Sequence, residues 1–183
     1  MPDPVPDNEP GRPAPERHDP QSTSTPRGDL DEVLSRGELW GLELEPRFRV
    51  LAVTLELAPG DGPWQLGDDR RIQLLCHPVS TILGALHRFD TDDAPQLVTF
   101  EADQLVEVAT AFGGVTLTPP VFGRPEPRPG QWGPRFSLEG RSSAPDGRSR
   151  TVTIEVADAD ARLRVFVRCD TVEVRDANGA ALT

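Results

Sequence analysis

The stretch RTVTIEVADADARLRVFVRCDTVEVR, residues 150–175, decides the fold. Apolar and polar residues alternate along it, as in strands that bury one face. Residues 157–160 and Asp170 favour turns between the strands. The expected strands cover residues 136–140, 150–156, 163–168 and 171–175. Short strands with close turns predict an antiparallel meander at the C-terminal end.

The two faces of this meander differ in chemistry. The residues expected to face the core are Val152, Ile154, Val156, Leu163, Val165, Val167, Val172 and Val174. The other face is expected to carry Thr151, Thr153, Glu155, Arg162, Arg164, Phe166 and Arg168. Arginines with an interleaved aromatic side chain suit phosphate binding or base stacking. We favour instead a solvated face on which Glu139, Glu155 and Glu173 pair with the arginines across strands.

The sequence on the N-terminal side of this stretch predicts a mixture of strands and short helices. A central strand is expected over 47–57, because both of its faces are fairly apolar. Residues 72–77 form a strand that Pro78 interrupts, residues 79–86 fit either a helix face or a bent strand, and 97–100 fit a return strand. Helices are expected over 29–37, capped by Asp29 and stopped by Gly37, and over 103–112, capped by Asp103 and ended by Gly113 and Gly114.

Taken together, these elements predict an α+β fold with a mainly antiparallel sheet of about six or seven strands and one or two short helices. Residues 1–28 hold eight of the 20 prolines and few apolar side chains, so we expect a disordered acidic tail. Residues 29–183 then form a single domain. Pro10 and Pro13 have the PxxP spacing of a polyproline ligand, although an extended solvated tail is the favoured interpretation.

Composition excludes several classes of protein. Thirty acidic residues against 19 basic ones give a formal net charge of −11, which disfavours nucleic-acid binding. The chain has no apolar run of membrane-span length and no signal-like N-terminus, so we expect a cytoplasmic protein without membrane attachment. All its basic residues are arginine, which is typical of a GC-rich genome and suggests a bacterial source. Cys76 and Cys169 form no disulfide framework and are expected to be reduced and buried.

Catalytic residue types come together in one place only, at Cys76, His77 and His87. Adjacent strand residues point to opposite faces, so Cys76 and His77 cannot pair with each other. Cys76 shares the apolar face of its strand, where cysteine behaves as a small hydrophobe. A metal site would combine the two histidines with Asp90, Asp92 or Asp93, but these aspartates also fit an ordinary turn. We expect no metal and no cofactor.

Two segments have the character of partner-binding elements. Residues 38–44 alternate acidic and apolar side chains, and Trp40 either docks into a partner or lies over the protein's own core. We favour the core, because large aromatic side chains are buried on average. Residues 118–134 form a loop with six prolines that carries Phe122 and Trp132. This loop either covers a pocket or presents a surface, or it is strapped onto the core by those aromatics.

Three functional hypotheses follow. The leading one is a non-enzymatic interaction or accessory protein that binds another protein. It rests on the scarcity of residue types suited to catalysis and on the presence of several segments that resemble partner-binding elements. The second is a small-molecule binding domain whose curved sheet encloses an apolar pocket under the 118–134 loop, with Trp64 or Trp132 at its mouth. The third is an enzyme that uses Cys76, His77 or His87. The sequence does not indicate the partner, the ligand or the oligomeric state.

Overall fold

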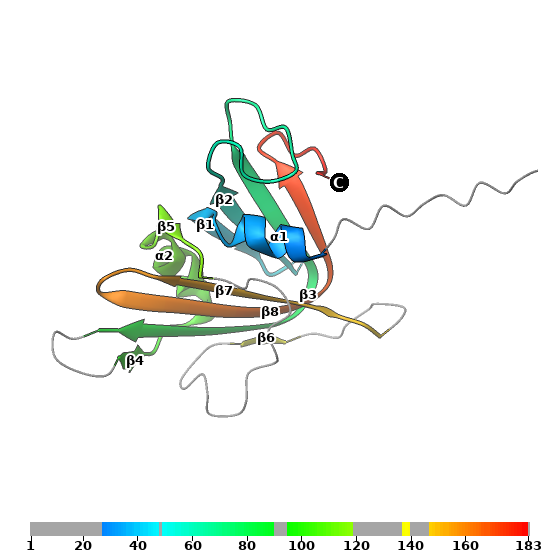
Figure 1. Ribbon diagram of the computed structural model, residues 1–183. Coiled ribbons are helices and arrows are strands. Elements are labelled where there is room, and N and C mark those ends of the chain that lie inside the picture. Colours follow the sequence, from blue (N-terminus) through cyan, green and yellow to red (C-terminus); the bar gives the residue numbers. More distant parts are fainter. Residues whose placement is uncertain (1–26, 48, 90–94, 119–136, 140–146, 183) are drawn as a thin grey trace, which may run out of the picture.

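The computed structural model describes residues 27–47, 49–89, 95–118, 137–139 and 147–182, and its described part is mostly one antiparallel sheet (Figure 1). Eight strands belong to this sheet within those ranges. They are β1 Glu38–Glu45, β2 Val50–Glu56, β3 Arg71–Arg88, β4 Gln96–Val98, β5 Val115–Thr116, β6 Ser137–Glu139, β7 Arg150–Ala157 and β8 Ala161–Asp176. The helical elements of the same ranges are α1 Arg27–Leu34, the 3-10 turn η1 Ala102–Gln104, and α2 Leu105–Thr110.

The two longest strands, β3 and β8, organise the sheet. They pair with each other over nearly their full lengths, and the pairing shifts register between Val79 and Thr81. The sheet bends there, and both strands run through the bend (Figure 1). On one side of the bend the order continues through β2 and β1 to β5, and on the other side β8 carries β7, while β3 carries β4 and β6. The bend therefore divides one sheet into two halves.

The sheet also curls back on itself. Leu117, directly after β5, forms an antiparallel bridge to Val156 of β7. The backbone N–H of Thr118 donates to the carbonyl of Glu155 at 2.7 Å. These bonds join the two ends of the strand order, so that the inner face surrounds a single core.

The inner face is filled by alternating apolar side chains, as the sequence predicts. The fully buried positions include Leu51, Val53, Leu55, Ile72, Leu74, Val152, Ile154, Val156, Leu163, Val165 and Val167. Val174 is buried and Val172 is half-buried beside the same cluster. Cys76 and Cys169 are free thiols within this core, so their expected burial is confirmed. The space that the sheet encloses is thus occupied by its own side chains.

The expected C-terminal meander is confirmed only in its β7–β8 hairpin. The break expected near Asp170 is wrong, because β8 runs without interruption from Ala161 to Asp176. β3 pairs with Cys169 and Thr171 on either side of Asp170, and this pairing overrides the turn preference of aspartate. The strand expected over 136–140 exists as β6, but it pairs with β3 rather than with β7.

Of the two alternatives for residues 79–86, the bent strand is correct. Pro78 lies inside β3, at the bend, where a strand tolerates a residue that donates no ladder hydrogen bond. The inward-facing positions have even numbers on both sides of the bend, and the odd-numbered Val79 faces inward at the bend itself, so Cys76, Val79 and Ile82 are all buried. This spacing of three residues resembles the period of a helix.

Both expected helices exist with different starts. α1 begins at Arg27, so Asp29 lies inside its first turn and is not its N-cap. The second helix opens with η1, and Gln104 rather than Asp103 precedes α2, without a side-chain cap. Leu105, Ala109 and Phe112 are buried, as predicted. α2 ends at Thr110, two residues before the expected end, and Gly114, with φ of 80°, closes the turn that follows.

The return strand after β3 is confirmed as β4, whose Val98 pairs with Leu86. Several predictions lie outside the described residues: the tail over residues 1–26, Phe122 and Trp132 with the loop over 119–134, and the turn over 90–94. In the part of the chain that is described, no helix has the length and apolar character to cross a membrane.

Candidate functional site

The structure keeps the three candidate catalytic residues apart. Cys76 is fully buried, and the neighbouring Cys169 thiol together with burial raises the pKa of the Cys76 thiol well above its usual value. His77 lies on the outer face, where its Nε2 is 2.9 Å from Oε1 of Glu173. His87 lies near the other end of β3. No observation therefore favours a nucleophile and base acting together.

The described residues also contain no group of three His, Cys, Asp or Glu side chains that could hold a metal ion. Arg162, Arg164 and Arg168 of β8 form a row, which we call the arginine row, and this row is largely neutralised, as we expected. Nε of Arg164 is 2.9 Å from Oε2 of Glu155, and Nε of Arg162 is 3.9 Å from Oε1 of the same carboxylate. Glu173 does not contribute to this pairing, because it lies beyond the bend and binds Arg175 and His77.

The expectation of a solvated face around that row is wrong. Phe166 is only 1% exposed and packs with Ala85, Leu83 and Leu97 in a small cluster on the outer face. Thr153 and Glu155 are buried as well. Arg168 is half-buried opposite Thr81 and Thr151. The ring of Phe166 is therefore not presented on the surface for stacking.

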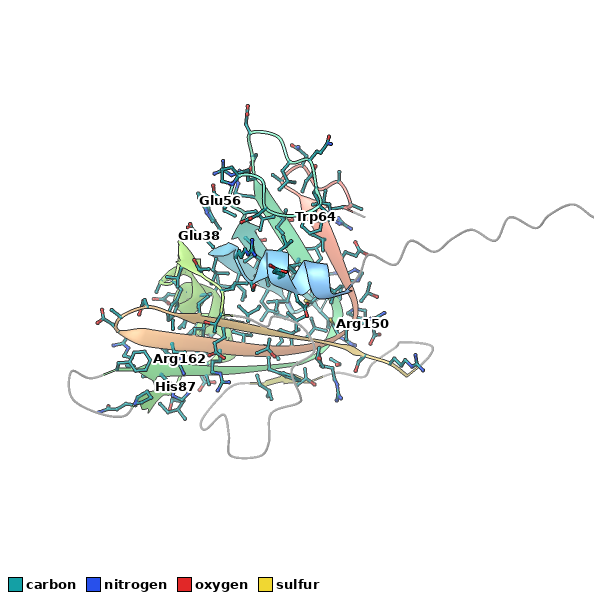
Figure 2. All side chains as sticks on the ribbon, in the orientation of Figure 1. Glu38, Glu56, Trp64, His87, Arg150 and Arg162 are labelled. Atoms are coloured by element: carbon teal, nitrogen blue, oxygen red, sulfur yellow. The ribbon has the colours of Figure 1, made fainter. Side chains whose placement is uncertain are left out.

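His87 lies beside the same row, close to Arg162 (Figure 2). Partial burial, followed by the positive charges of Arg164 and Arg162, holds the pKa of His87 below its usual value. The guanidinium of Arg162 lies 5.7 Å from the centre of the Phe89 ring. These arginines thus already have partners within the chain.

Trp40 differs from every other described tryptophan and phenylalanine, because half of its side chain is exposed to solvent. The expectation that it covers the core is wrong for Trp40 itself, although its neighbours Leu39 and Leu42 are buried. The pairing of β1 with β2 shifts register between Leu39 and Gly41, so Trp40 is the extra residue of a β-bulge. A bulge redirects a side chain, and here it directs an indole outward.

The indole of Trp40 is held by an arginine from two strands away. The guanidinium carbon of Arg71, on β3, lies 5.5 Å from the centre of the Trp40 ring. Arg71 is fixed in turn by Asp69, with Nε to Oδ1 at 2.8 Å and Nη2 to Oδ2 at 2.5 Å. These hydrogen bonds from Arg71 lower the pKa of Asp69 to about 2. An aromatic surface is therefore presented in a defined position.

The surroundings of Trp40 are acidic. Glu38 and Glu56 lie directly opposite each other on β1 and β2 (Figure 2), an arrangement of like charges that destabilises a sheet. Arg70 compensates Glu56, with Nη2 at 3.3 Å from Oε1. Within the described ranges, the carboxylates of Glu38 and Glu43 have no hydrogen bond or ion pair. These exposed negative charges are available to a cation from outside.

A shallow groove continues this surface along β1 and β2. Its volume is about 340 Å³, and it is lined by Glu43, Leu44, Glu45, Val50, Ala52 and Val106. Val106 of α2 is 38% exposed. The edge of β1 that points away from β2 pairs with β5 only at Glu38 and Leu39. We call Glu38, Trp40, Glu43, Arg71 and the groove together the Trp40 surface.

Comparison of the chain with protein-family models, curated proteins and solved structures found no match. The sequence singled out Trp40 but not Arg71, the first residue of β3, or Asp69, which lies two residues before it. Their only sequence signal is the charged run 68–71, which alone is typical of a solvated strand end.

Proposed function

We propose that this chain is a non-enzymatic interaction or accessory protein that binds a partner protein through the Trp40 surface. The observation that carries the proposal is the half-exposed Trp40, turned outward by a β-bulge and held by Arg71. Tryptophan and arginine are the residue types that most often dominate binding energy at protein interfaces. The cytoplasmic location stays a prediction.

The charges of the surface support one kind of partner. Glu38 and Glu43 offer uncompensated carboxylates beside an indole, and the groove adds Val50, Ala52 and Val106. A partner segment with lysine or arginine next to apolar side chains complements both features. The net charge of −11 adds long-range attraction for such a basic segment.

A random-peptide display library tests this proposal. We expect the wild-type protein to select peptides that combine Lys or Arg with apolar residues, and binding of these peptides to weaken as salt increases. Trp40→Ala should lose these peptides, and Glu38→Gln should weaken them. The matched controls are Arg36→Ala and Glu101→Gln, because both residues are exposed and lie outside the Trp40 surface. Selection of the same peptides by Trp40→Ala would refute the proposal.

A further inference from the structure

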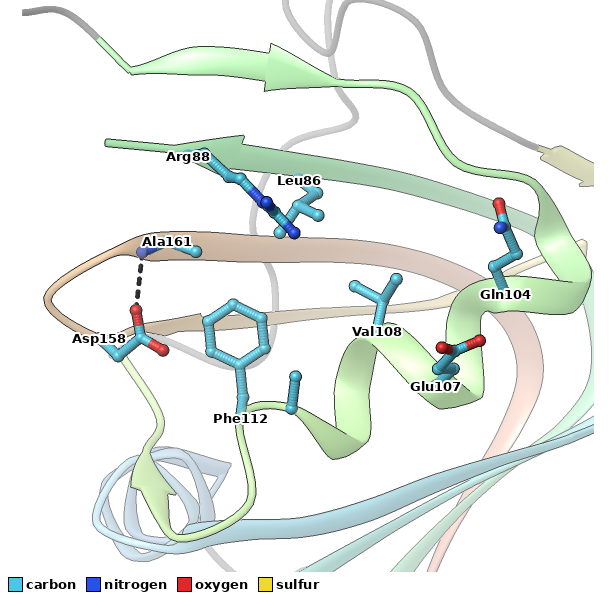
Figure 3. A pocket seen from close by; sticks show the side chains of 9 residues that line it. Leu86, Arg88, Gln104, Glu107, Val108, Phe112, Asp158 and Ala161 are labelled. Atoms are coloured by element: carbon cyan, nitrogen blue, oxygen red, sulfur yellow. Dashed lines mark hydrogen bonds between the residues drawn. The ribbon is translucent and has the colours of Figure 1, made fainter. Parts of the chain in front are cut away.

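A second concave site lies at the opposite face of α2, away from the Trp40 surface. It is a pocket of about 260 Å³ between α2 on one side and the end of β3 with the β7–β8 turn on the other (Figure 3). Its base is apolar, because Leu86 and Phe112 are buried and Val108 is half-buried. This volume is slightly below the range of drug-sized ligand pockets, so it suits a small metabolite.

The rim of the pocket carries charges of both signs. Arg88 reaches in from β3, and Glu107 stands across from it on α2 (Figure 3). Asp158 is already engaged, since its Oδ1 accepts the N–H groups of Asp160 and Ala161 at 2.9 and 2.7 Å. Gln104 is engaged as well, since its Oε1 accepts the N–H of Glu101 at 2.8 Å.

Arg88 and Glu107 are different. Neither side chain has an ion pair or hydrogen bond with any other residue in the described ranges. A purely anionic ligand would meet the repulsion of Glu107, and a purely cationic ligand would meet that of Arg88. A molecule with both charges and an apolar body complements Arg88, Glu107 and the apolar base of the pocket at once.

We propose that this pocket binds a free α-amino acid with an apolar side chain. Arg88 binds its carboxylate, Glu107 binds its ammonium group, and the side chain packs on Phe112, Leu86 and Val108. Binding here is independent of the Trp40 surface, so either proposal can fail while the other stands.

Titration of the ¹⁵N-labelled protein, followed by NMR, tests the assignment with L-phenylalanine and L-leucine as probes. We expect saturable shifts of the amides of Val108, Ala111 and Ala161. The same titration uses 3-phenylpropanoate, which lacks the ammonium group, and phenethylamine, which lacks the carboxylate. Each should bind about tenfold or more weakly than L-phenylalanine, because one charged rim group is left without a partner.

Two variants complete the test. Arg88→Ala and Glu107→Gln should each lower the affinity by about tenfold or more, whereas Arg36→Ala and Glu101→Gln should leave it unchanged. Arg88 and Glu107 are exposed, so both variants are expected to fold. Absence of saturable binding by both amino acids would overturn the proposal. Equal binding of 3-phenylpropanoate, or unchanged affinity of the Arg88→Ala protein, would overturn it too.

Discussion

The guanidinium carbon of Arg71 lies 5.5 Å from the centre of the Trp40 ring, although the two residues belong to strands separated by β2. The contact between the two side chains therefore spans β2. Asp69 holds the other side of the guanidinium with two side-chain hydrogen bonds. This arrangement fixes an exposed aromatic side chain without burying it, and it leads to the first prediction.

Replacement of Trp40 should affect binding much more than stability. A cation–π contact at an exposed site contributes about 0.5–1 kcal/mol, so we expect Trp40→Ala to lower the free energy of unfolding by about 1 kcal/mol or less. Leu74→Ala, in the core, should lower it by about 2–5 kcal/mol. Urea unfolding measures both. If Trp40→Ala lowered the free energy of unfolding as much as Leu74→Ala does, the indole would have a structural role.

The Asp69 carboxylate should stay ionised at pH values below the ordinary pKa of an aspartate. Its pKa is lowered from 3.8 to about 2 by hydrogen bonds from Arg71. Because the pKa is lowered in the folded state, the stabilising contribution is present above pH 3.8 and is lost as the pH falls toward 2. We expect carboxyl-carbon NMR to show this titration in the wild type and a higher pKa in Arg71→Ala, in which only the backbone N–H of residue 71 still donates to Asp69. An unchanged Asp69 titration in that variant would contradict the assignment.

The Glu155 carboxylate is the counter-charge of the arginine row, and its removal should have two effects. Glu155→Gln removes the charge of a buried carboxylate that pairs with the exposed Arg162 and the half-buried Arg164, so we expect a loss of about 1–3 kcal/mol in the free energy of unfolding. The negative charge of Glu155 also raises the pKa of His87. The variant should therefore lower the pKa of His87, which proton NMR measures. A rise of this pKa would be inconsistent with the described geometry.

The two thiols should be unreactive in the native protein. Cys76 and Cys169 are both fully buried, and the pKa of Cys76 is raised well above its usual value by the Cys169 thiol and by burial. Burial keeps a disulfide reagent such as DTNB away from both sulfur atoms, so the reagent should react only as the protein unfolds. Rates measured against urea concentration check this. Rapid reaction without denaturant would mean that this part of the core opens readily.

Much of the inner face could be predicted from the sequence, because alternation along Val152–Val156 and Leu163–Val167 reports burial directly. The bend could not be predicted in the same way. Cys76, Val79 and Ile82 are buried there at intervals of three residues, and this spacing matches both a helix and a bent strand. Asp170 carried a local turn signal that pairing with β3 overrides.

The candidate site was only partly predictable. Trp40 was recognisable as a large aromatic side chain in an acidic segment, but its exposure depends on a register shift that β1 adopts only when paired with β2. The partnership of Arg71 with Trp40 depends on strand order, which a single sequence does not contain. Phe166 shows the opposite case, because a small cluster with Leu83 and Leu97 buries a residue that alternation assigns to the polar face.

Photo-cross-linking in the native host tests the central claim most directly. A photoreactive phenylalanine analogue replaces Trp40 in one protein and Arg36 in a second, both of which are exposed. We expect position 40 to cross-link to one partner protein at a segment that contains Lys or Arg beside apolar residues, and Glu38→Gln with Glu43→Gln to reduce the yield. Position 36 should not label that partner. Equal labelling from both positions, or no partner at position 40, would contradict the proposal that the Trp40 surface binds a protein.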